Sequence, residues 1–288
     1  MGLCLHTTTL LPFFILLFIA FYSRRFVRKS TPPNRQGGSI VITGGNGVLG
    51  RSLISQAINI GLLVISLDVE YSPDFFQDIP DVIPIVCDIT EEESINNFLK
   101  KLETIRAKPF ALINAGAIAP KNRLFDMSSK QLARCIHVNT IGQFNITKML
   151  YPSLFLSVEP HIINVTSALA YFSASGVAAY SCSKAALLSL HETLEVETRQ
   201  MHVPIKLSLY SLGQFKSTMF DKDTPNKILA PLLNSNDIAH IILQNLMNNQ
   251  SGRFYHPLYV RFMPLLRFMP SEIQRIARWF SGMDEIYS

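Results

Sequence analysis

Short apolar runs alternate with longer amphipathic stretches between residues 39 and 250. Runs of about four to eight apolar or β-branched residues are typical of buried strands, whereas apolar residues three and four apart are typical of helices. The strands expected on this basis are 39–43, 62–67, 82–87, 110–114, 161–167 and 203–210. The first expected helix ends near residue 60, and the others span 91–106, 128–150, 177–202 and 236–249. This alternation predicts an α/β fold in which helices cover both faces of a parallel sheet.

The start of two helices can be assigned to a residue. Thr90 precedes an acidic first turn, so we expect it to be the N-cap of helix 91–106. Ser235 or Asn236 is expected to cap the last helix, because short polar side chains favour that position.

The first 29 residues have a different pattern. Residues 10–22 are apolar, and four cations follow them, Arg24, Arg25, Arg28 and Lys29. A cleaved signal peptide carries its charge before the apolar core, so this order argues against one. As a helix the apolar run covers about 20 Å, short of the roughly 30 Å hydrocarbon core, so we expect a marginal spanning anchor or an interfacial one. The cations favour a cytosolic position for the domain that follows, and residues 30–38 are interpreted as a linker.

Composition also favours a membrane surface. Of the 288 residues, 48% are apolar and 16% are charged, and the formal net charge is +5. Such a balance suits nucleic acid or an anionic membrane, but no nucleic-acid-binding motif accompanies it, so we expect a membrane and no nucleic acid. The four cysteines show no metal-ligand spacing, and no metal site is expected. The length fits one large α/β domain with appendages.

A glycine-rich turn follows the first expected strand. Strand 39–43 runs into Gly44, Gly47 and Gly50, and a helical pattern follows. This context is typical of a dinucleotide site, in which glycines let the backbone approach the pyrophosphate at a helix N-terminus. Asp68 ends the next strand and can accept hydrogen bonds from the ribose hydroxyls, which favours NAD. NADP is not excluded; the alternative for Asp68 is a solvated loop residue.

A tyrosine and a lysine four residues apart on helix 177–202 are the candidate catalytic pair. Tyr180 and Lys184 lie on one face of that helix. An ammonium about 4 Å from the phenol stabilises the phenolate by roughly 4 kcal/mol, or about three pKa units, which would bring the phenol pKa near 7. Such a group can exchange a proton with an alcohol or a ketone, and Ser167 would offer its hydroxyl to the same substrate oxygen. Taken alone, the pair also fits an amphipathic helix with a solvated lysine.

The remaining candidates share a position relative to the sheet. Asp88, Asn114 and Ser167 each follow or end an expected strand, as the glycine turn and Asp68 do. Ligands of open α/β sheets bind at the carboxyl ends of the strands. The coincidence strengthens each individual assignment.

In this order the residues resemble the short-chain dehydrogenase/reductase family over about residues 38–250. The residues that carry the resemblance are Thr43, Gly44, Asp88, Asn114, Ala115, Gly116, Asn139, Ser167, Tyr180 and Lys184. The resemblance implies a Rossmann-type doubly wound sheet and a nicotinamide cofactor.

The resemblance also implies roles for the catalytic residues. Tyr180 would be the acid/base, and Lys184 would lower its pKa and hold the nicotinamide ribose. Ser167 would polarise the substrate oxygen, and Asn139 would maintain a water path to Lys184. The cofactor-binding set that it implies is Gly44, Asn46, Gly47, Leu49, Gly50, Asp68, Asp88, Ile89, Asn114, Ala115, Gly116, Tyr180, Lys184 and Thr218.

Within the family the chain most resembles the membrane-anchored retinol and hydroxysteroid dehydrogenase-like branch and its fungal relatives. Two positions depart from the pattern. Val48 stands where the shorter branch has glycine, so the spacing T-G-x-x-G-x-x-G matches the extended, epimerase-like branch, and Leu212 replaces an expected proline. An extended-branch epimerase or dehydratase, or a non-catalytic membrane or lipid-droplet surface protein with this fold, are therefore the alternatives.

The segment 253–288 is basic and aromatic, and we separate it from the Rossmann domain at 39–252. Aromatic and apolar residues interleave with arginines there, which suits lipid headgroups. The segment could equally cover the substrate pocket or contact a second copy of the chain. The sequence thus predicts an NAD(P)-dependent oxidoreductase that interconverts alcohol and carbonyl on a retinoid, steroid or fatty alcohol. It is expected at the endoplasmic reticulum or lipid droplets, with its catalytic domain in the cytosol.

Overall fold

The computed structural model describes residues 27–28, 38–76, 79–215 and 231–281. The expected anchor, nearly all of the linker, and Thr218 lie outside these ranges. Among the described helices none is both long enough and apolar enough to cross a membrane.

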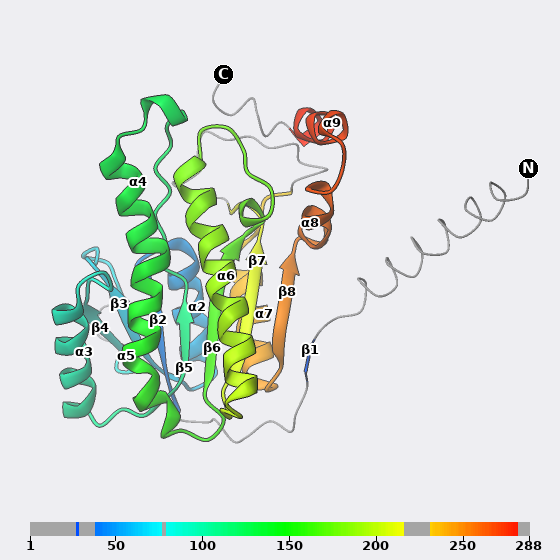
Figure 1. Cartoon of the computed structure of the whole chain (residues 1–288). Coiled ribbons are helices and arrows are strands. Elements are labelled where there is room, and N and C mark those ends of the chain that lie inside the picture. Colours follow the sequence, from blue (N-terminus) through cyan, green and yellow to red (C-terminus); the bar gives the residue numbers. More distant parts are fainter. Residues whose placement is uncertain (1–26, 29–37, 77–78, 216–230, 282–288) are drawn as a thin grey trace, which may run out of the picture.

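The described strands form one sheet in the order β1-β8-β7-β6-β5-β2-β3-β4 (Figure 1). Strands β2 to β8 are mutually parallel, and only β1 pairs antiparallel, with β8. The strands are β1 Val27–Arg28, β2 Ser39–Thr43, β3 Leu63–Asp68, β4 Val82–Val86, β5 Pro109–Asn114, β6 His161–Ser167, β7 Lys206–Leu212 and β8 Ser251–His256. The order reverses between β2 and β5, as in a Rossmann-type sheet. The predicted doubly wound fold is confirmed.

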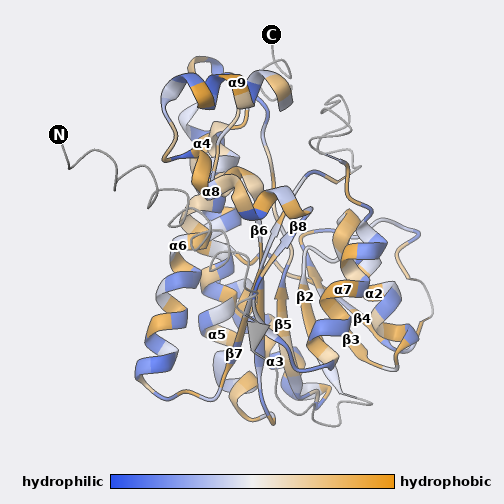
Figure 2. Ribbon diagram, turned by 90° about the vertical axis from the view of Figure 1, so that its right-hand side faces the viewer, coloured by the Kyte–Doolittle hydropathy of each residue, from blue (hydrophilic) through white to orange (hydrophobic). Residues whose placement is uncertain are grey.

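Helices cover both faces of the sheet, as expected. Helices α2 (Val48–Asn59) and α7 (Ser235–Met247) pack on one face, and α3 (Glu92–Thr104), α5 (Gln143–Phe155) and α6 (Ala178–Gln200) pack on the other. Strand β2 contributes to both cores, because Ile40 and Ile42 point to the first face and Val41 to the second. In Figure 2 the central strands are coloured hydrophobic, and the helices beside them alternate hydrophobic and hydrophilic residues.

The stretch expected as helix 128–150 is continuous but not uniform. Ser128 and Gln131 form a capping box at the start of α4 (Ser129–Ile136). A π-helical turn, His137–Gly142, then joins α4 to α5. Such turns are often found at functional sites, and this one contains Asn139.

Local details differ from the expectations. Both N-cap assignments are wrong. Glu91 is the N-cap residue of α3, while the Thr90 hydroxyl donates to Asp88 Oδ1 (2.7 Å). Asn234 is the N-cap residue of α7, and its side chain accepts a hydrogen bond from the Asn236 amide (2.9 Å). Strand β7 begins at Lys206 instead of 203, since Pro204 has no amide to donate to a ladder.

Strand β8 was not expected at all. It pairs in parallel with β7, and Phe254 stacks on Tyr210 with ring centroids 4.6 Å apart. The expected domain boundary after residue 252 falls inside this strand. The chain continues through a 3-10 turn, Leu258–Phe262, into α8 (Met263–Leu266) and α9 (Ser271–Ser281), which lie beyond the carboxyl ends of the strands (Figure 1).

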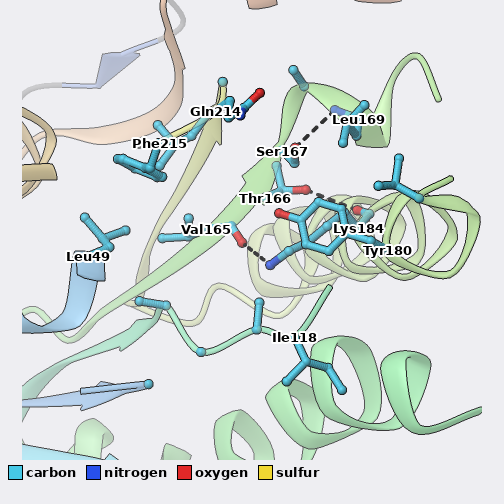
Figure 3. Close-up of a pocket in the computed structure, with 18 of the residues that line it drawn as sticks. Leu49, Ile118, Val165, Thr166, Ser167, Leu169, Tyr180, Lys184, Gln214 and Phe215 are labelled. Carbon is cyan, nitrogen blue, oxygen red and sulfur yellow. Dashed lines mark hydrogen bonds between the residues drawn. The ribbon is translucent and has the colours of Figure 1, made fainter. Parts of the chain in front are cut away.

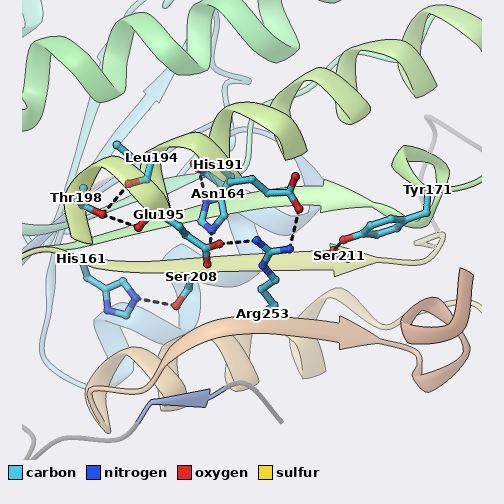
Figure 4. A network of polar contacts seen from close by, with 11 residues as sticks. His161, Asn164, Tyr171, His191, Leu194, Glu195, Thr198, Ser208, Ser211 and Arg253 are labelled. Atoms are coloured by element: carbon cyan, nitrogen blue, oxygen red, sulfur yellow. Dashed lines mark hydrogen bonds and ion pairs between the residues drawn. The ribbon is translucent and has the colours of Figure 1, made fainter. Parts of the chain in front are cut away.

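A polar network joins α6 to β8 and β6 (Figure 4). Arg253 on β8 donates to Glu192 (2.8 Å) and Glu195 (2.5 Å), and His191 Nδ1 lies 3.0 Å from Asn164 Nδ2 on β6. Burial raises the pKa of Glu195, but hydrogen bonds from His191 and Arg253 outweigh it and bring the pKa to about 2. The network therefore ties the unexpected strand to the centre of the fold.

Candidate active site

A cavity of about 1150 Å³ lies at the carboxyl ends of the strands. The sequence-predicted residues that line it are Gly44, Asn46, Gly47, Leu49, Gly50, Asp68, Asp88, Ile89, Ala115, Gly116, Ser167, Tyr180 and Lys184. Asn114 and Asn139 are not in its wall, and Thr218 lies outside the described residues. The fold thus brings together at one cavity residues that are far apart in the sequence.

The glycine turn is built by close contact between two loops. Gly44 has φ of +70°, and a Cβ placed there would lie 2.4 Å from Gly116 Cα. A Cβ on Gly50 would lie 2.1 Å from the Gly44 carbonyl oxygen. A larger residue at Gly44 would therefore push the loops after β2 and β5 apart, and one at Gly50 would push α2 away from the glycine turn. Gly45, which the sequence analysis overlooked, is needed because its Cβ would lie 1.8 Å from Ser66 Oγ.

Val48 replaces the family's glycine at the first residue of α2. Its side chain is 41% exposed and lines the cavity, whereas Gly47 is the N-cap. The N-terminus of α2 lies at the cavity, as an anionic phosphate group requires. The tight glycine contacts, this helix end and Asp68 fit a dinucleotide.

Asp68 also holds the glycine turn. Its two carboxylate oxygens accept hydrogen bonds from the backbone amides of Asn46 and Val69, each at 2.8 Å. Burial raises the pKa of Asp68 and outweighs these hydrogen bonds, which lower it. Arg51, which the sequence analysis did not consider, donates to Asn46 Oδ1 (2.9 Å) and lies 3.5 Å from Asp74. A cation thus lies beside the turn, engaged with protein groups.

Asp88 and Asn114 have different environments. Asp88 lines the cavity and accepts a hydrogen bond from the Thr90 amide (2.9 Å). Asn114 is buried, and its Nδ2 donates to Thr147 Oγ1 (3.0 Å) and Asn164 Oδ1 (2.8 Å). The Asn-Ala-Gly segment therefore faces the cavity with Ala115 and Gly116, while Asn114 joins β5 to the interior.

Ser167, Tyr180 and Lys184 meet at the centre of the cavity wall (Figure 3). Ser167 ends β6, and its Oγ accepts from the Leu169 amide (3.1 Å) and shares a hydrogen bond with Tyr180. Lys184 Nζ donates to the Val165 carbonyl (2.9 Å) and lies 5.8 Å from the centroid of the Tyr180 ring. Tyr180 and Lys184 are both buried.

The pKa of Tyr180 does not approach 7 in this structure. Burial raises the pKa of Tyr180 to about 12, although the hydrogen bond with Ser167 lowers it in part. Burial also lowers the pKa of Lys184 to about 8. The sequence-based expectation assumed an ammonium about 4 Å from the phenol and ignored desolvation, which disfavours both charged forms. With this pKa the phenol is protonated at neutral pH.

Asn139 does not line the cavity but holds a segment of its wall by hydrogen bonds. Its Oδ1 accepts from the Ile118 amide, and its Nδ2 donates to the Ile118 carbonyl, both at 2.8 Å, and to Ser183 Oγ at 2.9 Å. Ile118 itself lines the cavity (Figure 3). Asn139 is therefore a positioning residue for the segment that follows β5.

The other half of the cavity is apolar and is covered by the C-terminal helices. Its wall includes Ile118, Val138, Leu169, Phe172, Phe262, Met263, Leu266, Met269, Ile273, Ala277 and Phe280. Arg278 on α9 donates to the Ser173 carbonyl (2.5 Å) and stacks 4.2 Å above the Phe172 ring. These contacts attach α9 to the loop after β6 and close the cavity on that side.

Comparison with known proteins agrees with this geometry. The short chain dehydrogenase family profile matches residues 39–228, which favours the shorter branch over the extended one. Two uncharacterized oxidoreductases of Saccharomyces cerevisiae are among the relatives. The first is 28% identical over 263 residues, which cover 88% of this chain and 84% of the relative. The second is 29% identical over 253 residues, which cover 86% of this chain and 77% of the relative. Human estradiol 17-beta-dehydrogenase 11 is 24% identical over 194 residues, covering 67% of this chain and 64% of that protein.

Solved structures support the fold. A short chain dehydrogenase from Burkholderia cenocepacia in complex with NADP has a TM-score of 0.68 at 22% identity and covers 85% of this chain and 98% of its own. The 3-ketoacyl-(acyl-carrier-protein) reductase from Brucella melitensis, complexed with NADH, has a TM-score of 0.66 at 18% identity and covers 77% and 97%. The chain therefore belongs to the short-chain dehydrogenase family, in which it is an NAD(P)-dependent oxidoreductase similar to the retinol and hydroxysteroid dehydrogenases.

Proposed function

We propose that this enzyme interconverts an alcohol and a carbonyl group on a lipophilic substrate, with NAD as the preferred cofactor. The observation that carries the proposal is the division of one cavity into two halves. One half has the glycine turn and Asp68, the other has an apolar wall, and Ser167, Tyr180 and Lys184 lie between them.

The cofactor half suits a dinucleotide without a 2′-phosphate. The glycine turn and the N-terminus of α2 would hold the pyrophosphate, and Asp68 would accept the ribose hydroxyls. When bound, the nicotinamide supplies or accepts the hydride. A carboxylate at position 68 repels a 2′-phosphate, and Arg51 is already engaged by Asn46 and Asp74.

The proton is moved by Tyr180. With a pKa of about 12 in the ligand-free site, its hydroxyl is protonated and can donate to a carbonyl oxygen held by Ser167. The phenolate that forms lies near the Lys184 ammonium. With the 5.8 Å between Lys184 Nζ and the Tyr180 ring centroid as the charge separation and an effective dielectric of ~20, the ammonium stabilises the phenolate by about 2.8 kcal/mol, or about two pKa units. Oxidation, the reverse direction, needs a further lowering of the Tyr180 pKa.

The substrate class follows from the apolar half. Leu169 and Phe172 from the segment after β6, Met263 and Leu266 from α8, and Phe280 from α9 present hydrocarbon to the cavity. Ligand sites lined this way bind apolar bodies and use a few polar groups for orientation. A retinoid, steroid or fatty chain with its oxygen at Ser167 fits this chemistry.

We also retain the sequence-based expectation of a membrane location. The apolar run at 10–22 and the four cations after it support attachment to the endoplasmic reticulum or lipid droplets, with the catalytic domain in the cytosol.

The test is turnover of purified protein with NAD(H) or NADP(H) and a panel of retinoid, steroid and fatty alcohols and carbonyls. Reduced nicotinamide is followed by absorbance. We expect turnover with NAD(H), its loss in Tyr180→Phe, and full activity in the control Tyr151→Phe on α5. Asp68→Ala should shift the ratio of NADP to NAD affinity upward, measured by calorimetry.

Two outcomes would contradict the proposal. One is the absence of turnover with every lipid substrate, in both directions, by a protein that binds NAD; this would favour a non-catalytic role. The other is unchanged turnover in Tyr180→Phe, which would assign the proton transfer to another group.

A further inference from the structure

We propose that the rim of the cavity is a docking surface for anionic phospholipid, built from two segments of the catalytic domain. We call it the mouth surface and define its apolar part as Leu124, Phe125, Phe268, Ile276 and Trp279. The inference rests on the proposed membrane association and adds the face of the domain that meets the lipid.

The apolar part of the mouth surface is unusually exposed. Phe125 is 100% exposed, Phe268 84% and Trp279 67%. Soluble monomers rarely expose large apolar groups together, and such groups mark interaction sites. Phe125 precedes α4, whereas Trp279 belongs to α9; both helices lie at the end of the molecule where the strands have their carboxyl ends (Figures 1 and 2).

Cations accompany these side chains in both segments. Residues 121–134 contain Lys121, Arg123, Lys130 and Arg134 against one carboxylate, Asp126. Residues 258–281 contain Arg261, Arg267, Arg275 and Arg278 against one carboxylate, Glu272. Aromatic side chains flanked by cations match the interface of an anionic leaflet, where the rings enter the headgroup region and the cations meet phosphates.

A second apolar cluster shows that exposure alone does not define the site. Leu156 and Val158, between α5 and β6, are 78% and 77% exposed. They lie at the opposite end of the sheet, and the segment 151–160 contains Glu159 but no lysine or arginine. This cluster has the hydrophobicity of the mouth surface without its charge, so it supplies a matched control.

The mouth surface is continuous with the cavity. Arg134 of the first segment and Ile273 and Phe280 of the second line the cavity, and α4 and α9 therefore flank its opening. A domain docked here would receive an apolar substrate from the leaflet without passage through water.

Trp279 provides a direct test, because it is the one tryptophan of the chain. The full chain is mixed with phosphatidylcholine vesicles that contain or lack phosphatidylserine, with or without a brominated phosphatidylcholine. We expect a blue shift of the tryptophan emission and quenching by the brominated lipid, both stronger with phosphatidylserine. Vesicle flotation reports binding of the chain as a whole, including binding through residues 1–29.

Variants separate the contributions. Arg267→Gln with Arg275→Gln should raise the lipid concentration for half-maximal quenching about 25-fold, at roughly fivefold for each cation. Phe125→Ser should also weaken quenching, although it lies about 150 residues from the probe in the sequence. Leu156→Ser, the matched control, should change neither signal.

Several results would overturn the proposal. A chain that floats with the vesicles while its tryptophan stays unquenched would be attached through another segment only. A blue shift that grows with protein concentration in the absence of lipid would identify a second copy of the chain as the occupant. Equal quenching with and without phosphatidylserine would remove the role of the cations. In contrast, quenching in a chain that shows no turnover would support the docking surface and would reject only the proposed reaction.

Discussion

Replacement of Lys184 by methionine should stabilise the ligand-free enzyme at neutral pH. The ammonium is buried and donates a hydrogen bond to the Val165 carbonyl (2.9 Å). Burial lowers the pKa of this lysine from 10.5 to about 8. A base whose pKa is lower in the folded state than in the unfolded state destabilises the fold whenever it is protonated. The cost is complete well below pH 8 and fades as the pH rises toward 10.5.

The magnitude follows from the two pKa values. Each unit of pKa difference corresponds to ~1.36 kcal/mol, so protonated Lys184 costs about 3 kcal/mol at pH 7 and about 1.4 kcal/mol near pH 9.5. Methionine has a similar length and no charge, but it leaves the Val165 carbonyl without its donor, at a cost of about 1–2 kcal/mol. Lys184→Met should thus gain about 1–2 kcal/mol at pH 7 and almost nothing near pH 9.5.

The assay is urea unfolding of both proteins at the two pH values without cofactor. The informative quantity is the change of the stability difference with pH, because the loss of the hydrogen bond is the same at both. Lys100→Met on α3, where the lysine is exposed, is the control and should show no such change. A stability difference that is independent of pH, or a Lys184→Met variant less stable than wild type at pH 7, would refute the desolvation argument. Gain of stability on loss of a catalytic group is the usual trade-off at functional sites.

Three further perturbations test other parts of the site. Gly44→Ala should abolish NAD binding in calorimetry and lower stability by about 2–4 kcal/mol, because its Cβ would lie 2.4 Å from a backbone carbon and φ is +70°. Arg278→Ala should weaken binding of an apolar ligand several-fold while NAD affinity stays unchanged; equal loss of both would contradict its role in holding α9. Glu195, with a pKa of about 2 against an ordinary 4.5, contributes stability that is present above pH 4.5 and lost as the pH falls toward 2. Arg253→Gln should therefore flatten the decline of the melting temperature below pH 4.5, and an unchanged decline would count against the network.

Elements with a repeating apolar pattern could be predicted from the sequence. Strand β2 is apolar at residues 40–42 because both of its faces are buried there, and the parallel arrangement of the sheet brings Asp68 and Ser167 to the same edge. Residue identity and strand position together identified the residues of the cavity wall that belong to the glycine turn and the strand ends, and the Tyr180–Lys184 pair beside them.

Other features depend on contacts that a linear pattern does not contain. Strand β8, with the sequence Ser-Gly-Arg-Phe-Tyr-His, has no apolar alternation and forms because β7 offers it a partner. The role of Asn139 depends on Ile118, which approaches it only in the folded chain. The high pKa of Tyr180 reflects burial by all the surrounding elements, which motif spacing does not report.

β4 and β8, the outermost strands of the sheet apart from the two-residue β1, differ in how they resist pairing with another chain. β4 carries Pro84, which has no amide to offer a neighbour. β8 is covered only at Ser251 and Gly252, by the short β1. A chain shortened to begin at residue 38, as is common when an apolar leader is removed for expression, would lose that cover. Its open strand would then invite edge-to-edge aggregation, so residues 27–28 belong in any soluble version of this enzyme.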